Sequence, residues 1–211
     1  ALPIWAEEKK VLLEERRKLE QLPPVNAGNL ANFGSLPGRR ISFTGQFDES
    51  ITLLLDNRVL DGQVGFEVHQ LFNDVSGQIF LVNRGFLPMG RTRQDLPEIP
   101  AVGGVQITVI GEVYEVAGNP VLLATEEPST NLFPVIVQQV DAGAWATGLG
   151  ITIFPQVIRL AEDQPGALPR YWPATVIPVA KHQGYAAQWF TMAAAVLLVW
   201  LYFSFRKEED A

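Results

Sequence analysis

The chain has 211 residues, of which 47% are hydrophobic, so it corresponds to about one domain with a substantial core. Its formal net charge of -7 argues against a nucleic-acid-binding surface, which needs concentrated positive charge to displace counterions. The absence of cysteine excludes disulfides, iron–sulfur ligation and thiol catalysis.

Residues 1–22 predict the end of a membrane anchor followed by a juxtamembrane helix. The first five residues, ALPIW, are apolar and typical of a membrane interface, and no methionine precedes them. We therefore expect an upstream transmembrane helix before Ala1. Residues 6–22 are charged and favour a helix until Pro23-Pro24, which stops it. The apolar residues of this helix form only a thin stripe, so we expect it to be solvated.

Residues 23–180 predict a mainly β domain. Short runs of β-branched and aromatic residues are separated by Gly, Pro and Asn. In one run, Ile41, Phe43, Gly45 and Phe47 alternate with more polar residues, as in a strand with one buried face. The eight predicted strands are residues 40–47, 50–55, 63–72, 78–83, 105–116, 135–140, 152–160 and 174–179. Their spacing favours a small antiparallel β-barrel or a sandwich.

Three segments predict connections within this domain. Asp61-Gly62 predicts a turn, because glycine adopts a positive φ without strain. Residues 90–104 are polar and proline-rich, which is typical of an extended crossover. Residues 139–149 contain Ala, Gly and Trp and predict one short helix that interrupts the strands.

Residues 181–206 predict a membrane-interface motif and a transmembrane helix. The 21 residues from Tyr185 to Phe205 carry no charge, and a helix of this length spans the hydrocarbon core of roughly 30 Å. Tyr and Trp lie near both ends, and Arg206-Lys207 follow as a cytoplasmic anchor. We therefore expect residues 207–211 to form a cytoplasmic tail and the β domain to be extracytoplasmic.

The sequence shows no catalytic or metal-binding motif. Its two histidines, His69 and His182, are far apart and form no HExxH site. The serines lack the context of a nucleophile elbow, and no phosphate-binding glycine loop is present. We therefore predict that the protein is not an enzyme. His69 alternates onto the more polar face of strand 63–72, which predicts a surface residue.

Four motifs in a fixed order give the chain a specific resemblance. They are NRxxDGxxGFEV from Asn57, LVNRGFxP from Leu81, QPG from Gln164 and HxGYAxQWF from His182. Together with the terminal apolar helix, they resemble the Surfeit locus protein 1 family of cytochrome c oxidase assembly factors. Phe86 departs from the tryptophan that is common in the family, which keeps an aromatic face but loses the indole donor.

The resemblance implies two membrane helices flanking an extracytoplasmic β domain, and a role in inserting haem a into the catalytic subunit of cytochrome c oxidase. The implied partners are this catalytic subunit and membrane lipid, with haem a synthase as a further candidate. The alternative is a scaffold that binds no haem and stabilises an oxidase assembly intermediate through protein contacts. No mitochondrial presequence is visible, so we prefer a bacterial inner membrane to the mitochondrial inner membrane.

With this resemblance, His182 becomes the candidate ligand of haem iron, because a neutral imidazole is a common axial ligand. Gly184 leaves backbone room for a macrocycle. Tyr185 and Trp189 offer flat apolar contacts. Gln188 follows Gly184 by one helical turn and is expected on the same side. The alternative interpretation of His182 is a polar residue tolerated at headgroup depth.

Arg84 has two interpretations. The first is an internal ion pair, with Asp56 or Asp61 as candidate partners. The second is a contact with a haem propionate, because the guanidinium fork matches a carboxylate. We include Arg84 among the candidate haem-binding residues on the second interpretation.

Overall fold

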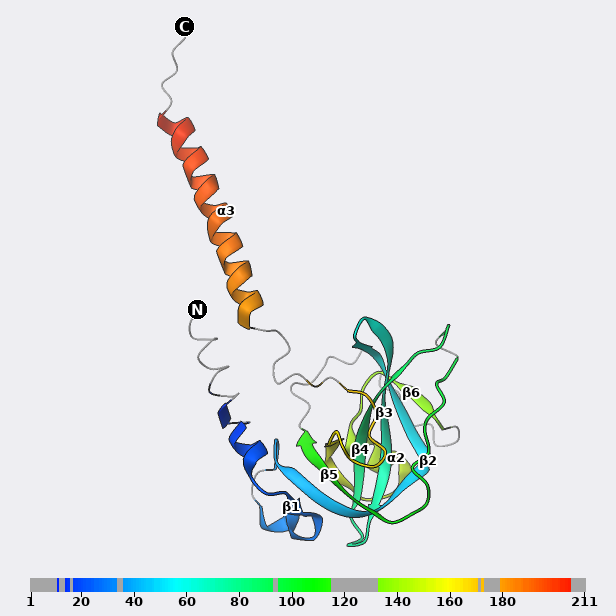
Figure 1. Ribbon diagram of the computed structural model, residues 1–211. Coiled ribbons are helices and arrows are strands. Elements are labelled where there is room, and N and C mark those ends of the chain that lie inside the picture. The colour runs from blue at the N-terminus through cyan, green and yellow to red at the C-terminus, as the bar shows by residue number, and fades with distance from the viewer. Residues whose placement is uncertain are drawn as a thin grey trace. The chain divides into compact units, whose positions relative to one another are not determined.

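The computed structural model describes residues 11, 14–15, 17–33, 36–92, 95–114, 133–170, 172 and 179–205, and only the backbone of residues 31 and 179–187. The chain divides into two compact units (Figure 1). The first, residues 14–172, contains the whole β-sheet, and the second contains the C-terminal helix α3.

The first unit begins with helical residues, as predicted. Residues 14–15 and 17–21 are helical, and the chain leaves the helix before Pro23-Pro24. A short strand, β1 (Val25–Asn26), and a 3-10 helix, η1 (Ala27–Asn32), follow. Asn26 caps η1 by accepting a hydrogen bond from the amide of Gly28 at 2.9 Å.

Seven strands form one sheet, which confirms the mainly β class. After β1, they are β2 (Arg40–Leu60), β3 (Gln63–Asp74), β4 (Ile79–Pro88), β5 (Ile107–Tyr114), β6 (Val135–Val137) and β7 (Ile153–Leu160). The order is β1-β2-β3-β4-β7-β5, with β6 on β2. Because β5 also pairs with β2, the pairings β2–β3–β4–β7–β5 return to β2 and make the sheet partly ring-like. The pairs β1–β2, β2–β6 and β4–β7 are parallel, and the others are antiparallel.

The structure differs from the predicted strands at two places. The predicted strands 40–47 and 50–55 are one strand, β2, because the pairing with β3 shifts register between Asp48 and Thr52 without ending. The predicted strand 174–179 lies outside the described residues except for Val179, which is helical. The remaining five correspond to β3, β4, β5, β6 and β7 with altered ends, and residues 115 and 116 of the predicted strand 105–116 lie outside the described residues.

The predicted connections are confirmed. Asp61 and Gly62 form the turn between β2 and β3 with positive φ angles of 49° and 80°. The described residues of segment 90–104 contain no strand and carry the chain from β4 to β5. The short helix is α2 (Ala142–Leu149), capped by the Asp141 side chain and ended by Gly150 in the left-handed conformation.

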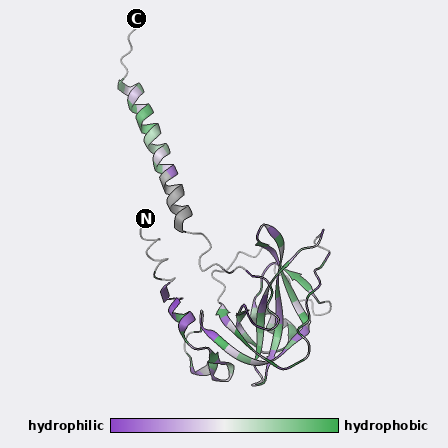
Figure 2. Ribbon diagram, viewed as in Figure 1, coloured by the Kyte–Doolittle hydropathy of each residue, from purple (hydrophilic) through white to green (hydrophobic). Residues whose placement is uncertain are grey.

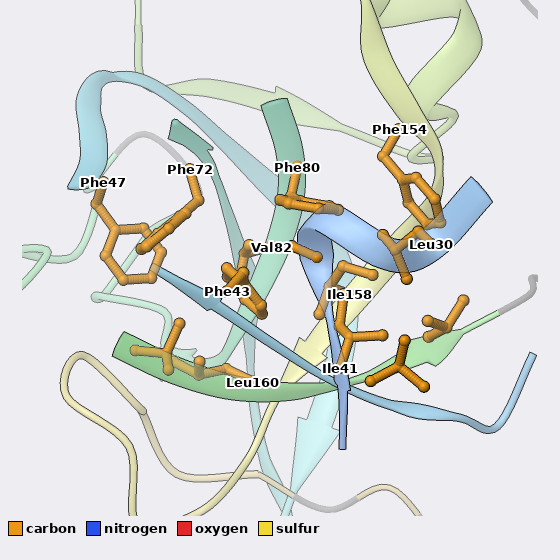
Figure 3. Packing of buried hydrophobic residues seen from close by; sticks show 14 residues of the cluster. Leu30, Ile41, Phe43, Phe47, Phe72, Phe80, Val82, Phe154, Ile158 and Leu160 are labelled. Carbon is orange, nitrogen blue, oxygen red and sulfur yellow. The ribbon is translucent and has the colours of Figure 1, made fainter. Parts of the chain in front are cut away.

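The two larger of three buried apolar clusters pack on the two faces of the sheet. The larger draws side chains from every strand of the ring, and Phe43 lies at its centre (Figure 3). Its ring centroid is 4.8 Å from that of Phe72 and 5.1 Å from that of Phe80. On the other face, Leu71 and Val157 pack with Trp145 of α2. Because both faces are covered, polar residues of the strands near these clusters are buried as well.

The second unit contains one long apolar helix, α3 (Val179–Phe205). From residue 188 on, most of its residues are coloured hydrophobic or intermediate in Figure 2. Among the described residues it alone is long and apolar enough to cross a membrane, with a mean hydropathy of 1.5 over Gln188–Phe205. The predicted apolar helix is therefore confirmed, and its insertion and orientation stay predictions. It begins six residues before Tyr185, so it also includes His182 and Gly184.

Replacing Phe43 by alanine should lower the free energy of unfolding by about 3–5 kcal/mol, because the change opens a cavity among packed aromatic rings. Denaturant unfolding of the purified chain, followed by circular dichroism, measures this. Val75→Ala is the matched control: Val75 is 67% exposed, so we expect a change within about 0.5 kcal/mol. Equal losses in the two variants would contradict the assigned core.

Candidate functional site

Two polar clusters lie on opposite faces of β3 and β4. Successive residues of a strand point to opposite faces, so His69 and Gln70 are separated in this way, as are Asn83 and Arg84. Gln70 and Arg84 belong to one cluster, and His69 and Asn83 belong to the other. All four side chains are buried, with exposed fractions of 1–2%.

Arg84 ties β3 and two loops to β4. Its Nη1 donates to Oε1 of Gln70 at 2.7 Å. Its Nε donates to the carbonyl of Gly166 at 2.7 Å, and its Nη2 donates to the carbonyl of Pro100 at 2.8 Å. The guanidinium carbon also lies 5.5 Å from the centroid of the Phe47 ring. All three guanidinium nitrogens thus hold parts of the β domain together.

Gly85 allows the loop that contains Leu168 and Pro169 to approach β4 closely. Its φ is +125°, and a Cβ atom there would lie 2.6 Å from the carbonyl oxygen of Leu168 and 2.7 Å from that of Pro169. The same approach allows the amide of Phe86 to donate to Pro169 and the amide of Leu168 to donate to Arg84, at 2.6 and 2.8 Å. The Arg84-Gly85-Phe86 motif therefore fits against the loop that follows Gly166.

The predicted ion pair of Arg84 with Asp56 or Asp61 is wrong. Among the described residues, the hydrogen-bond acceptors of Arg84 are two carbonyls and an amide oxygen. Burial lowers the pKa of Arg84 below its ordinary value, and the charge of Glu49 opposes this shift. Asp61 lies in the exposed turn, while Asp56 accepts from the Asn57 amide at 2.7 Å. The contact of Arg84 with a haem propionate stays a prediction.

The second cluster lines a cavity of about 240 Å³, the His69 cavity. Residues of β2, β3, β4, β5 and β7 line it, together with residues 138–140 after β6. In this cavity Asn83 Nδ2 donates to Glu67 Oε2 at 2.8 Å, and Arg58 Nε lies 3.9 Å from Glu67 Oε1. The first two sequence motifs therefore meet here, since Arg58 and Glu67 belong to one and Asn83 to the other.

His69 is buried in this cavity, so its predicted surface position is wrong. The alternation in strand 63–72 predicted that His69 lies on an exposed face. In the structure, residues 138–140 and the apolar cluster under α2 cover this face. Its Nδ1 lies 3.3 Å from the carbonyl oxygen of Glu67, which can only accept, so Nδ1 carries the proton and Nε2 a lone pair. Burial lowers the pKa of His69 to about 4, partly opposed by Glu67. The imidazole is therefore neutral at pH 7.

Arg159 connects the cavity to the end of the β domain. Its guanidinium carbon lies 3.3 Å from the centroid of Tyr114 and 5.0 Å from that of Trp172. Arg170 lies 4.9 Å from the same Trp172 ring. The guanidinium groups of Arg159 and Arg170 thus both contact Trp172, the last residue of this unit. The sequence interpretation missed Glu67, Asn83 and Arg159 as site residues, although the motifs contain the first two.

The other candidate residues lie in α3. The positions of His182, Tyr185 and Trp189 are three and seven residues apart, so the helix places them on one face. Gly184 and Gln188 are four residues apart and share another face. Gln188 and Trp189 are exposed in this unit, whereas the side chains of residues 179–187 lie outside the described part. Arg84 belongs to the other unit, and haem contact by these residues stays a prediction.

Comparisons with known proteins identify similar sequences. The family model described as the SURF1 family matches residues 5–194. Uncharacterised SURF1-like proteins of Mycobacterium bovis and of two strains of Mycobacterium tuberculosis are each 27% identical over 130 residues. The similarity covers 62% of this chain and 46% of each relative, so the match spans about half the length of these relatives.

Protonation of His69 should make the fold less stable in mild acid. Its pKa is about 4 in the folded chain and 6.5 in the unfolded chain, so the unfolded chain binds the extra proton between these values. Stability should therefore fall as the pH drops from 6.5 to about 4, by about 3 kcal/mol in total. Denaturant unfolding at pH 6.5 and 4.5 measures this. His69→Gln has no imidazole to protonate, so it should lose less stability over this pH range. An identical loss of stability in both proteins would refute the role of His69.

Arg84→Met should lower the free energy of unfolding by about 3 kcal/mol, because it leaves three buried acceptors without donors. Arg84→Lys should recover only part of the loss, since one ammonium cannot point in three directions. Limited proteolysis should show new cleavage in residues 95–106 and 161–170, which Arg84 holds. Arg91→Met, at an exposed position, should leave stability and cleavage unchanged. Unchanged cleavage in Arg84→Met would contradict the anchoring role.

Proposed function

This chain belongs to the SURF1 family, and on this basis we propose that it is a membrane-anchored, non-catalytic assembly factor for cytochrome c oxidase. In this proposal it holds haem a as cargo and assists its insertion into the catalytic subunit. The family match over residues 5–194 supports the assembly role, and the apolar helix α3 supports the membrane anchor.

The chain has two histidines that are candidate ligands of haem iron, and their surroundings favour His182. The His69 cavity has a volume of about 240 Å³, which is below the roughly 300–1,000 Å³ of pockets for drug-sized ligands. A farnesylated macrocycle does not fit there. His182 lies six residues before the apolar segment Gln188–Phe205. If this segment spans the membrane, as we propose, His182 would lie near the interface, the depth to which such a macrocycle would partition. The single observation that carries the proposal is this position of His182 on α3.

The neighbouring residues of α3 supply the other contacts. On the same helical face as His182, Tyr185 and Trp189 would flank the macrocycle, and Trp189 is 68% exposed in its unit. Gly184 would let the ring approach the backbone, and Gln188 would add a hydrogen bond on the neighbouring face. His182 would bind the iron through a neutral ring nitrogen.

The β domain would supply the surface for protein partners, the oxidase catalytic subunit and, as a further candidate, haem a synthase. We place this domain on the extracytoplasmic side of a bacterial inner membrane, with α3 in contact with lipid. Arg84 would contribute mainly by holding the loops around Pro100 and Gly166, and a propionate contact would have to use the second N–H of Nη1 or Nη2 on a side chain that is only 1% exposed.

A scaffold that never binds haem is the second candidate function, and one observation favours it. The contacts within the β domain involve motif residues, namely Arg84, Gly85 and Gly166. The need to fold this domain is therefore enough to explain why the motifs contain these residues. On this alternative, the protein would stabilise an assembly intermediate of the oxidase through contacts of the β domain.

Titration of haem a into the detergent-solubilised chain, followed by absorption spectroscopy, tests the proposal. The wild type should bind stoichiometrically, and His182→Ala should lose binding because the iron loses its axial ligand. His69→Gln is the matched control and should still bind haem. Circular dichroism on all three proteins verifies the fold.

Haem binding retained in a folded His182→Ala variant would rule out this ligand. Absence of binding by the wild type, in a preparation that still associates with oxidase subunits, would instead favour the scaffold.

A further inference from the structure

Trp172, the last residue of the first unit, is held between two guanidinium groups. The guanidinium carbon of Arg159 lies 5.0 Å from the centroid of the Trp172 ring, and that of Arg170 lies 4.9 Å from it. Arg159 in turn lies 3.3 Å from the centroid of the Tyr114 ring. A cation within about 6 Å of an aromatic centroid is attracted by the ring. The four side chains therefore form one continuous stack, the Trp172 stack.

Each arginine of the stack is positioned by its own segment. Arg159 belongs to strand β7 and pairs with residues of β4 on one side and of β5 on the other. Arg170 lies beyond β7, and its Nη1 donates to the carbonyl oxygen of Leu160. Its Nη2 also lies 3.6 Å from Oε2 of Glu162. Trp172 is thus attached to the sheet through two side chains that have positions of their own.

The attachment of Trp172 is separate from the hydrophobic core. Among the described residues, the three buried apolar clusters do not include Trp172, which is half-buried. Glu162, which pairs with Arg170, is 83% exposed. Surface contacts of this kind can open locally while the sheet stays folded, because opening uncovers little apolar area.

The chain just before Arg170 is attached more firmly, by backbone hydrogen bonds to β4. The amide of Leu168 donates to the carbonyl of Arg84 at 2.8 Å, and the amide of Phe86 donates to the carbonyl of Pro169 at 2.6 Å. Opening of the Trp172 stack would therefore release the chain only from residue 170 onwards.

We propose that the Trp172 stack is a latch that sets the length of chain between the first unit and α3. With the latch closed, the seven steps from Trp172 to Val179 span at most about 25 Å, at about 3.6 Å for each step. With the latch open, the last fixed residue is Pro169, and the ten steps to Val179 span at most about 36 Å. Opening thus adds about 11 Å to the span that the chain permits. The proposal goes beyond the role in oxidase assembly and does not depend on haem binding.

Limited proteolysis of the full chain in detergent tests the latch. Trypsin cuts after arginine, and cleavage after Arg170 requires its guanidinium to leave the stack and enter the protease. When opening is fast relative to cleavage, the cleavage rate reports the population of the open state. Trp172→Ala removes both cation contacts of the ring, so this cleavage should become about tenfold faster.

Two further measurements serve as controls for this experiment. Trp172→Phe keeps an aromatic face and should be cut at a rate between those of the wild type and Trp172→Ala. Cleavage after the exposed Arg91 is the internal reference and should stay the same in all variants.

Hydrogen exchange separates opening of the latch from a general loss of stability. The amide of Leu168 is bound to Arg84 ahead of the latch, so its exchange should be equal in the wild type and in Trp172→Ala. Arg170→Lys retains a trypsin site but loses the planar guanidinium, so cleavage after residue 170 should be faster in this variant as well.

Two results would overturn the proposal. Unchanged cleavage after Arg170 in Trp172→Ala would show that the stack does not hold the chain. Acceleration of Leu168 exchange by the same factor as the cleavage would show that Trp172 contributes only to general stability. If Trp172→Ala fails to fold, unchanged cleavage in Arg170→Lys decides against the latch.

Discussion

The fold of the β domain depends on how one buried cation is satisfied. Arg84 lies at 1% exposure, and its nitrogens donate to the carbonyls of Pro100 and Gly166 and to Gln70. A buried guanidinium is costly unless its donors are matched, so two loops far apart in the sequence must present carbonyls at the same place. Glu49 helps by accepting from the amides of Val102 and Gly103 at 2.6 and 3.1 Å, which holds the first loop from its other side.

Strands β3 and β4, which carry Gln70 and Arg84, also shape the His69 cavity on their opposite face. Asn83 precedes Arg84, and its side chain points the other way, where it donates to Glu67 and accepts from the Gly85 amide. A change at β4 therefore acts on both clusters at once. This coupling explains why the residues around Arg84 form a continuous motif: alternate positions hold the loops and shape the His69 cavity, and Gly85 admits the loop that follows Gly166.

Local patterns predicted much of the architecture. The turn at Asp61-Gly62, helix α2 and the apolar helix α3 follow from signals within a few residues, namely glycine in a tight turn and a charge-free run. The interpretations of His69 as a surface residue and of Arg84 as the ion-pair partner of Asp56 or Asp61 failed for one reason. The first considered the pattern of one strand and the second considered charged residues of the preceding motif, whereas the surroundings of these two residues come from residues 138–140, Pro100 and Gly166.

The sequence by itself determined the mainly β class, the terminal apolar helix and the family, because these depend on periodicity, composition and motif order. Only the tertiary structure decided that the strands close into a partly ring-like sheet, that His69 is a buried neutral imidazole, and that Arg84 binds carbonyls instead of aspartates. The physical reason is that burial and hydrogen-bond partners are set by segments brought together from distant parts of the chain. No local pattern contains that information.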